Sequence, residues 1–252
     1  MISLSFMQLS ILVVLIFFAG FVDSVAGGGG LISLASYSFF GLPPVIALGN
    51  NKFGSTFGTA FAMYSYIKAG LVIWKSALFS ALFALLGSLV GASLALHYSD
   101  YYFRYMMLIL LPVIGFFILR KKELYKGKRR SGKSEIIIAS LIGALIGTYD
   151  GFFGPGTGMF LTLAFSALLG YDTLNSCANT KVINFSSNVA ALVTFILNGT
   201  IIYSIGIPCA IASILGNSAG ARYAIKGGGK AVRPMVLFVL LLLMINIISS
   251  FF

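Results

Sequence analysis

The long apolar runs of this chain constrain its fold more than any other feature. Ten apolar segments follow one another, and several, such as residues 78–96, approach the ~20 residues that a helix needs to cross the ~30 Å hydrocarbon core of a bilayer. Only 9% of the 252 residues are charged, whereas a soluble domain carries about a quarter. So little charge cannot cover the surface of a globule in water. We therefore expect an all-α, polytopic helical membrane protein.

One strongly basic stretch divides the apolar segments into two groups of five. The approximate bounds are 5–23, 29–41, 48–67, 72–97 and 101–119 before it, and 135–150, 156–170, 179–197, 201–223 and 232–252 after it. Residues 120–133 contain eight Lys and Arg residues, which is typical of a cytoplasmic loop between membrane spans. We predict a first repeat at 1–119, a basic cytoplasmic linker at 120–133 and a second repeat at 134–252.

The two groups of segments match in detail, which indicates an internal duplication. GFVDSVAGGGGLISL (20–34) aligns with GTYDGFFGPGTGMFLTL (147–163), and two extra residues in the second glycine turn change the offset from 127 to 129. At the second offset Asn50-Asn51-Lys52 aligns with Asn179-Thr180-Lys181. Further aligned glycines are Gly41 with Gly170, Gly70 with Gly199, and Gly87 and Gly91 with Gly216 and Gly220.

The distribution of basic residues predicts that the two repeats are inverted. The loop 68–75 carries two lysines, and its counterpart 198–202 carries no charge. Counting crossings from the cytoplasmic linker places these equivalent loops on opposite sides and puts fourteen of the seventeen Lys and Arg residues on the cytoplasmic face, as the positive-inside rule expects. The count requires the first two segments of each half to form a short hairpin that returns to its starting side. Whether the hairpins re-enter or cross fully is left open.

Two glycine-rich turns are the first candidate site. Their candidate binding residues are Gly27, Gly28, Gly29 and Gly30 in the first half and Gly154, Gly156, Thr157 and Gly158 in the second. Non-helical backbone at membrane depth is tolerated only where it is buried or lines a cavity. Broken helices in inverted repeats point free N–H groups and the positive ends of their dipoles at an anion. The alternative is that these are ordinary tight turns.

Intramembrane charges and amides are the second candidate feature. They are Asp23 and Asp150, Lys52 and Lys181, and the amides Asn50, Asn51, Asn179, Asn184 and Asn188. A charge at this depth is costly and is expected to be paired or functional. Two roles stay open for the charges: a structural Asp–Lys pair that fixes each hairpin against the next helix, or anion binding with proton coupling through the aspartates. The donor-rich face suits an oxyanion better than a metal ion, so we expect no metal and no cofactor.

The sequence disfavours several other functions. The net charge of +11 is concentrated between apolar segments instead of being interleaved with aromatic residues on a solvated face, which argues against nucleic-acid binding. No catalytic triad, metal pair or nucleophile elbow is present in the sequence, so we do not expect an enzyme. A second copy of the chain is a candidate partner, and the oligomeric state is left open.

The quoted motifs, together with GLPPVIALGNNKFGSTFGTAFAMYSYIKAG (41–70) and ANTKVINFSSNVAALVTF (178–195), resemble the TauE/SafE family of membrane permeases and, within it, the YfcA-like branch. The resemblance covers residues 20–233. It implies a multi-pass permease of the plasma (inner) membrane with about seven or eight spans, and export of sulfite, sulfoacetate and related organosulfur anions. The sequence GPGTG replaces the four glycines of the first turn, which would make the two half-sites unequal.

The sequence therefore predicts a secondary transporter that exports a small organosulfur or organic anion, with its site at the hairpin interface near mid-membrane. Its expected partners are the anion and the lipid bilayer. The alternative is a non-transporting membrane scaffold or accessory subunit, in which the same charges only hold helices together.

Overall fold

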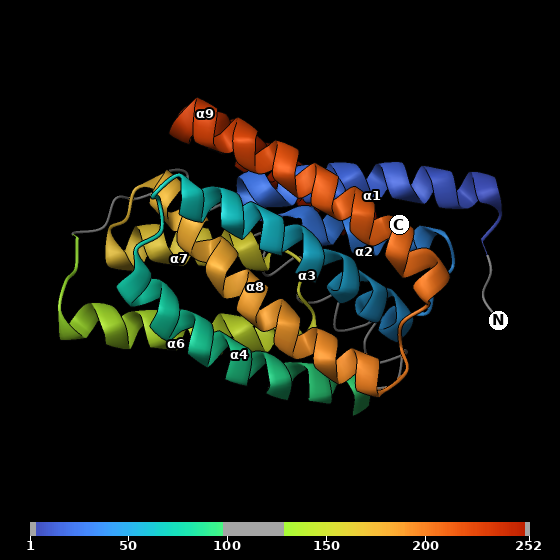
Figure 1. Ribbon diagram of the computed structural model, residues 1–252, viewed down its shortest axis with the longest axis horizontal. Helices are drawn as coiled ribbons and strands as arrows, with labels where there is room; N and C mark the ends of the chain where they lie inside the picture. The colour runs from blue at the N-terminus through green and yellow to red at the C-terminus, as the bar shows by residue number, and fades with distance from the viewer. Residues whose placement is uncertain (1–3, 98–128, 250–252) are drawn as a thin grey trace.

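The computed structural model describes residues 4–97 and 129–249, and all regular structure in these ranges is helical (Figure 1). The helices of the first half are α1 (Phe6–Ala26), α2 (Gly29–Phe39), α3 (Pro44–Lys68) and α4 (Trp74–His97). Those of the second half are α6 (Lys133–Phe152), α7 (Thr157–Leu169), α8 (Thr173–Leu197) and α9 (Tyr203–Ser249). The expected all-α membrane fold is confirmed. The predicted segment 101–119 and residues 120–128 of the linker lie outside the described residues.

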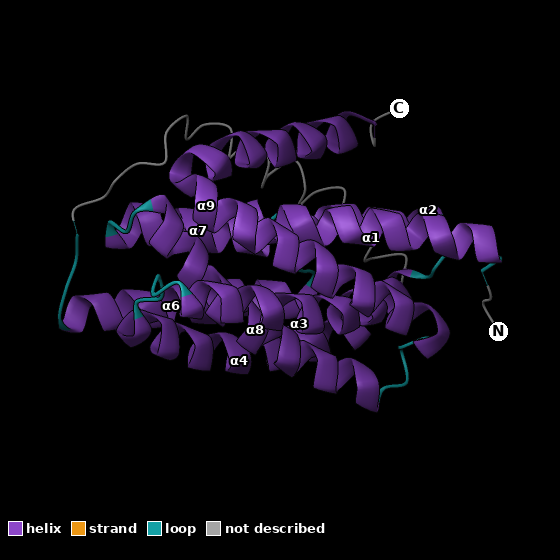
Figure 2. Cartoon of the chain, turned by 45° about the horizontal axis from the view of Figure 1, so that its top comes forward, coloured by secondary structure: helices purple, strands orange, loops and turns teal. Residues whose placement is uncertain are grey.

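The predicted segments agree with these helices except at three places. α3 and α8 begin earlier than predicted. The Pro43-Pro44 pair at the start of α3 resembles a loop in composition, and the first turn of α8 is polar. In α8 the Asp172 carboxylate caps the helix, accepting the N–H groups of Leu174 and Asn175 at 2.9 Å each. The predicted segments 201–223 and 232–252 fall in the single element α9, which bends sharply in Figure 2.

Five of the described helices are long and apolar enough to cross a membrane: α1, α4, α6, α8 and the Tyr203–Gly227 part of α9. Their outward faces carry large exposed apolar side chains, such as Leu78, Leu82 and Leu86 of α4, which suit contact with lipid. α2 and α7 contain only 11 and 13 residues, or roughly 16 and 20 Å of helix. They are therefore shorter than the bilayer core. The protein is a multi-pass membrane protein with two short, broken helices.

The helix contacts of the two halves correspond to each other. α1 packs on α9 as α6 packs on α4, and α3 packs on α9 as α8 packs on α4. α3 and α8 contact each other at the centre. The α3–α4 and α8–α9 connections lie at opposite ends of the bundle (Figure 1). Glycines aligned by the repeat also share a left-handed backbone: the φ angles are 77° and 80° at Gly27 and Gly156, and 69° and 65° at Gly70 and Gly199.

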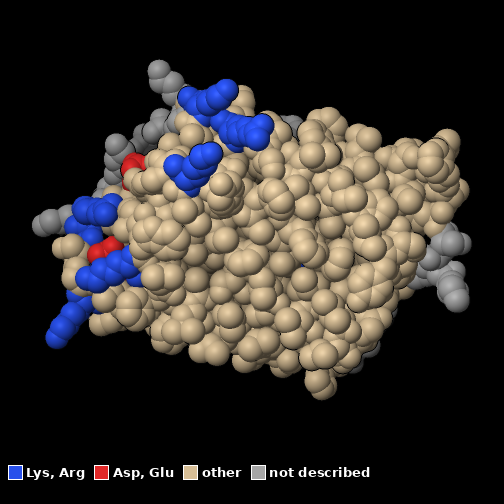
Figure 3. All heavy atoms as spheres, viewed as in Figure 1, with Lys and Arg blue, Asp and Glu red and all other residues tan. Residues whose placement is uncertain are grey.

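Basic side chains gather at one end of the bundle, the end at which α3 is followed by α4 (Figure 3). The basic residues recorded as exposed include Lys68, Lys75, Arg129, Arg130, Lys133, Arg222 and Lys226. The long tan face beside them shows almost no charge (Figure 3). A belt free of charge with one basic end is the pattern of a helical membrane protein whose basic end is cytoplasmic.

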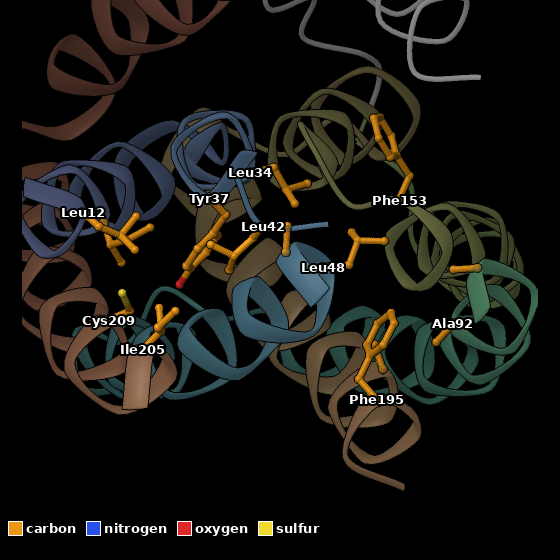
Figure 4. Close-up of a cluster of buried hydrophobic side chains, with 14 of the residues drawn as sticks. Leu12, Leu34, Tyr37, Leu42, Leu48, Ala92, Phe153, Phe195, Ile205 and Cys209 are labelled. Carbon is orange, nitrogen blue, oxygen red and sulfur yellow. The ribbon is translucent and has the colours of Figure 1, made fainter. Parts of the chain in front are cut away.

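Buried apolar side chains from both halves form a shared core near the α8–α9 end (Figure 4). Leu12, Leu34 and Leu48 of the first half pack in one cluster with Phe153 and Phe195 of the second. Each half therefore buries its apolar surface against the other, and the two halves form one structural unit.

Candidate functional site

Two buried ion pairs connect the halves of the molecule. Lys52 Nζ on α3 lies 2.9 Å from Asp150 Oδ1 on α6, and Lys181 Nζ on α8 lies 2.8 Å from Asp23 Oδ2 on α1. Both lysine side chains are 1% exposed. The structure thus contains the predicted Asp–Lys pairs, but the expected partners are wrong. Each lysine reaches the hairpin of the opposite half instead of its own, because α3 and α8 lie side by side at the centre.

Two neighbouring polar side chains form hydrogen bonds with the Lys52–Asp150 pair. Lys52 Nζ also donates to Asn188 Oδ1 at 2.9 Å, and the Ser187 hydroxyl donates to Asp150 Oδ2 at 2.6 Å. Both oxygens of this carboxylate are therefore engaged. Asn188 is predictable from its helical spacing from Lys181, whereas Ser187 gives no signal in the sequence.

The two glycine turns meet backbone to backbone. The N–H group of Met159 donates to the carbonyl oxygen of Gly27 at 3.2 Å. A Cβ atom on Gly27 would lie only 2.2 Å from the carbonyl carbon of Gly158, so this contact requires glycine. α2 and α7 begin after Gly28 and Gly156, and neither N-terminus is capped by a side chain. The positive ends of both broken helices are thus brought to the interface between the halves.

A small cavity lies between the turns and the ion pairs, and we call it the central cavity. It has a volume of about 20 Å³, which is room for about one water molecule. Its lining residues are Asp23, Gly27, Gly30, Asn51, Lys52, Ser55, Asp150, Gly154, Thr157, Gly158, Asn184 and Asn188. Eleven of the seventeen candidate residues therefore surround one point. Ser55 was not among the candidates, because a lone serine gives no signal in the sequence.

Four other candidates lie close to the central cavity. Gly28 and Gly156 are the N-cap residues of α2 and α7. Gly29 is the first residue of α2 and packs against Asp23 of α1. A Cβ atom added to Gly29 would lie 2.4 Å from the Cβ atom of Asp23. Lys181 reaches the cavity lining through its ion pair with Asp23.

Asn50 and Asn179 are not brought to this site. Asn179 Oδ1 accepts the N–H group of Ile73 at 2.8 Å, and its Nδ2 donates to the Ser76 hydroxyl at 3.1 Å. It therefore holds the start of α4. Asn50 Nδ2 donates within its own helix to the carbonyl oxygen of Ile46 at 2.9 Å. Each asparagine precedes its lysine by two residues, and 3.6 residues per turn place it about 200° around the helix.

A second polar cluster lies at the basic end, in the connection between α7 and α8. The buried Tyr171 hydroxyl donates to the Glu135 carboxylate and contacts the Ser76 hydroxyl at 2.6 Å. Arg129 lies 4.3 Å above the tyrosine ring. Burial, followed by the hydrogen bond to the Glu135 carboxylate, raises the pKa of Tyr171 to about 12. The hydroxyl therefore stays protonated and connects α6 to the α7–α8 connection.

The charged groups of the site can contact an anion. Among the described residues no group of three or more His, Cys, Asp or Glu side chains comes together. The two lysines and two aspartates cancel in formal charge. An anion that entered would meet lysine ammonium groups and two helix N-termini, in competition with the aspartates.

Fold and site together define a polytopic helical membrane protein of the broken-helix class that includes secondary transporters. The chain belongs to the TauE/SafE family, because the family model described as sulfite exporter TauE/SafE matches residues 12–247.

Curated relatives carry names of the same kind. The chain is 35% identical over 248 residues to a probable membrane transporter protein, ORF9, from Sinorhizobium sp., covering 98% of this chain and 95% of the relative. It is 34% identical to a probable membrane transporter protein of Haemophilus influenzae, covering 90% and 89%. It is 32% identical to the probable membrane transporter protein YfcA of Escherichia coli K12, covering 88% and 82%. The comparison with solved structures gave no match.

Proposed function

We propose that the protein is a secondary transporter that exports a small anion, such as sulfite, sulfoacetate or a related organosulfur or organic anion. The anion would bind in the central cavity, between the two halves. The observation that carries the proposal is the crossed arrangement of the ion pairs, which puts a buried lysine from each half at the meeting point of two uncapped helix N-termini. The direction of transport and the class of anion are taken from the name of the family and not from the geometry of the site.

An anion would act by competing with the aspartates for the lysines. An oxyanion offers Lys52 and Lys181 the charge-assisted hydrogen bonds that the carboxylates now provide. Breaking one buried ion pair without replacement costs about 3–5 kcal/mol, so a lysine is released only when the anion takes over its charge. Neutralisation of an aspartate, for example by a coupling proton, would favour the same exchange.

The exchange would require the halves to move. The central cavity of about 20 Å³ is too small for sulfite, so the conformation described is closed around the site. Both ion pairs and the Gly27–Gly158 contact cross between the halves, and opening would have to separate them. The paired helix contacts and the opposite placement of the two equivalent loops support inverted repeats, in which one half rocks against the other.

Flux in proteoliposomes tests the proposal. Wild-type protein should move radioactive sulfite, or another anion from a panel of sulfoacetate, thiosulfate and small carboxylates. Lys52→Ala and Lys181→Ala should each abolish this flux while the protein still reaches the membrane. Lys68→Ala, at the exposed C-terminal end of α3 on the basic end of the bundle, is the matched control and should transport normally.

Two results would contradict the proposal. Normal flux in both lysine variants would remove the lysines from the site. Wild-type flux no greater than that of protein-free vesicles for every anion in the panel would favour the scaffold alternative.

A further inference from the structure

A second polar cavity lies beside the Asp23 carboxylate and is lined by residues of α1, α2, α3 and α9. This Asp23 cavity also has a volume of about 20 Å³. Its polar side chains besides Tyr37 are Asp23, Ser33, Asn51, Ser55, Ser213 and Asn217, and no lysine or arginine lines it. Unlike the central cavity, it therefore presents a carboxylate with hydroxyl and amide groups, and no cation.

Asn217 offers this cavity an acceptor that has no partner. The residue is 2% exposed, and its Nδ2 donates to the backbone oxygen of Ser213 at 3.0 Å. Its Oδ1 is buried and receives no hydrogen bond from the described residues. A buried acceptor left unsatisfied costs about 1–3 kcal/mol, so this oxygen is open to a ligand within the cavity.

The two intramembrane carboxylates differ in how many of their oxygens have a partner. Asp150 uses both oxygens, one for Lys52 and one for Ser187. Asp23 uses Oδ2 for Lys181, and within the described ranges no hydrogen bond reaches Oδ1. Ser187 aligns with Gly58 at the repeat offset, so the first half lacks the hydroxyl that fills this place in the second. The Asp23 side chain is accordingly 20% exposed, against 5% for Asp150.

Glycines preserve the space that Ser213 and Asn217 occupy. A Cβ on Gly20 of α1 would lie 2.9 Å from Asn217 Nδ2, and a Cβ on Gly58 of α3 would lie 2.2 Å from the Ser213 hydroxyl. The residues aligned with Ser213 and Asn217 in the first repeat are Ala84 and Ser88. The Ser213 hydroxyl and the Asn217 amide are thus absent from the equivalent positions of the first half, where Ser88 supplies a hydroxyl and Ala84 no polar group.

We propose that the Asp23 cavity binds a monovalent cation of the size of Na⁺. A carboxylate with amide and hydroxyl oxygens is the ligand set of a hard cation. One carboxylate, whose charge is already shared with Lys181, favours a monovalent over a divalent ion. The cavity holds about one water-sized object, which fits a dehydrated sodium ion.

The cation site would couple to the anion site through Asp23. A cation on Asp23 and the ammonium of Lys181 repel each other, so cation binding weakens the Lys181–Asp23 pair and frees Lys181 for the anion. By linkage, the anion then strengthens cation binding equally. This role in transport rests on the proposed anion site, whereas the binding of the cation does not.

Direct binding of radioactive sodium to the purified protein in detergent, in choline chloride and without an anionic substrate, tests the site. The variants Asn217→Ser and Ser213→Ala install the side chain that the other repeat carries at the aligned position. We expect saturable binding to wild type, weakened roughly tenfold or more in Asn217→Ser, and weakened also in Ser213→Ala. Ser80→Ala is the matched control, because this buried α4 serine also has a hydroxyl without a partner among the described residues but does not line the cavity.

The outcomes separate the two proposals. No saturable sodium binding to folded wild type, or wild-type affinity in both variants, would overturn the cation site. Anion flux that follows a pH gradient and ignores sodium would overturn the proposed coupling through Asp23, and this result would leave the anion transporter standing. Sodium binding that persists in a protein without anion flux would refute the transporter and keep the cation site. Should Asn217→Ser fail to fold, as judged by size-exclusion chromatography, Ser213→Ala decides alone.

Discussion

The crossed ion pairs predict a specific pattern of energetic coupling between the two halves. In a double-mutant cycle with Lys52→Met and Asp150→Asn, each single change leaves one buried charge without its partner. At a separation of 2.9 Å and an effective dielectric constant of about 20, the Coulomb attraction is about 6 kcal/mol. Desolvation offsets part of this attraction, so we expect each single change to cost about 3–5 kcal/mol.

The double variant should cost much less than the sum of the single variants, which gives a coupling energy of about 3 kcal/mol. The Lys181–Asp23 pair should couple more weakly, because the Asp23 side chain is 20% exposed and that of Asp150 is 5% exposed. The controls are the pairs within one half, Lys52 with Asp23 and Lys181 with Asp150, which form no ion pair in the described structure and for which we expect a clearly smaller coupling energy.

Unfolding free energies measured by SDS titration in mixed micelles provide the assay. Strong coupling within each half, together with weak coupling between the halves, would refute the crossed arrangement. It would also remove the reason to place both lysines at one site.

Two further predictions concern the turns and the basic end. Gly27→Ala should destabilise the protein by several kcal/mol more than Gly41→Ala in thermal unfolding. Both glycines have a positive φ angle, but only a Cβ atom on Gly27 would meet another backbone, that of Gly158, within 4 Å. Equal losses of stability would show that only backbone strain matters. Tyr171→Phe should cost roughly 1.5–3 kcal/mol, because it removes the hydrogen bond that the buried hydroxyl donates to the Glu135 carboxylate. That contribution is complete below pH 10 and is lost as the pH rises to about 12, so the stability difference between wild type and variant should narrow over this range; a constant difference would contradict the role of the hydroxyl.

Much of the fold could be predicted because the internal repeat shows directly which residues of the two halves are equivalent. Aligned glycines indicate the same backbone bend in both halves, and Gly27 and Gly156 do share a left-handed conformation. The long apolar runs identify spanning helices because lipid tolerates little else. The beginnings of α3 and α8 were predicted too late, since the prolines at the start of α3 and the polar first turn of α8 resemble loops in composition.

The partners of the charges could not be predicted, because a repeat does not say which copy of a residue meets which. Lys52 has two equivalent carboxylates within the molecule, and only the contact of α3 with α8 selects Asp150. Asn179 was expected at the site from its closeness to Lys181 in sequence, although a two-residue step turns it to another face of the helix. Asn217 lies in an apolar segment without an acidic residue, so nothing in the sequence connects it to Asp23.

Cysteine accessibility tests the account most directly, because everything proposed depends on the two halves crossing the membrane in opposite senses. In a background with Cys177→Ala and Cys209→Ala, single cysteines are introduced by Ala69→Cys and Asn198→Cys, at exposed positions of the two equivalent loops. An impermeant maleimide added to intact cells should label Asn198→Cys, and should label Ala69→Cys only after the membrane is opened. Labelling of both positions from the same side would contradict the inverted arrangement, and with it the shared site between the broken helices.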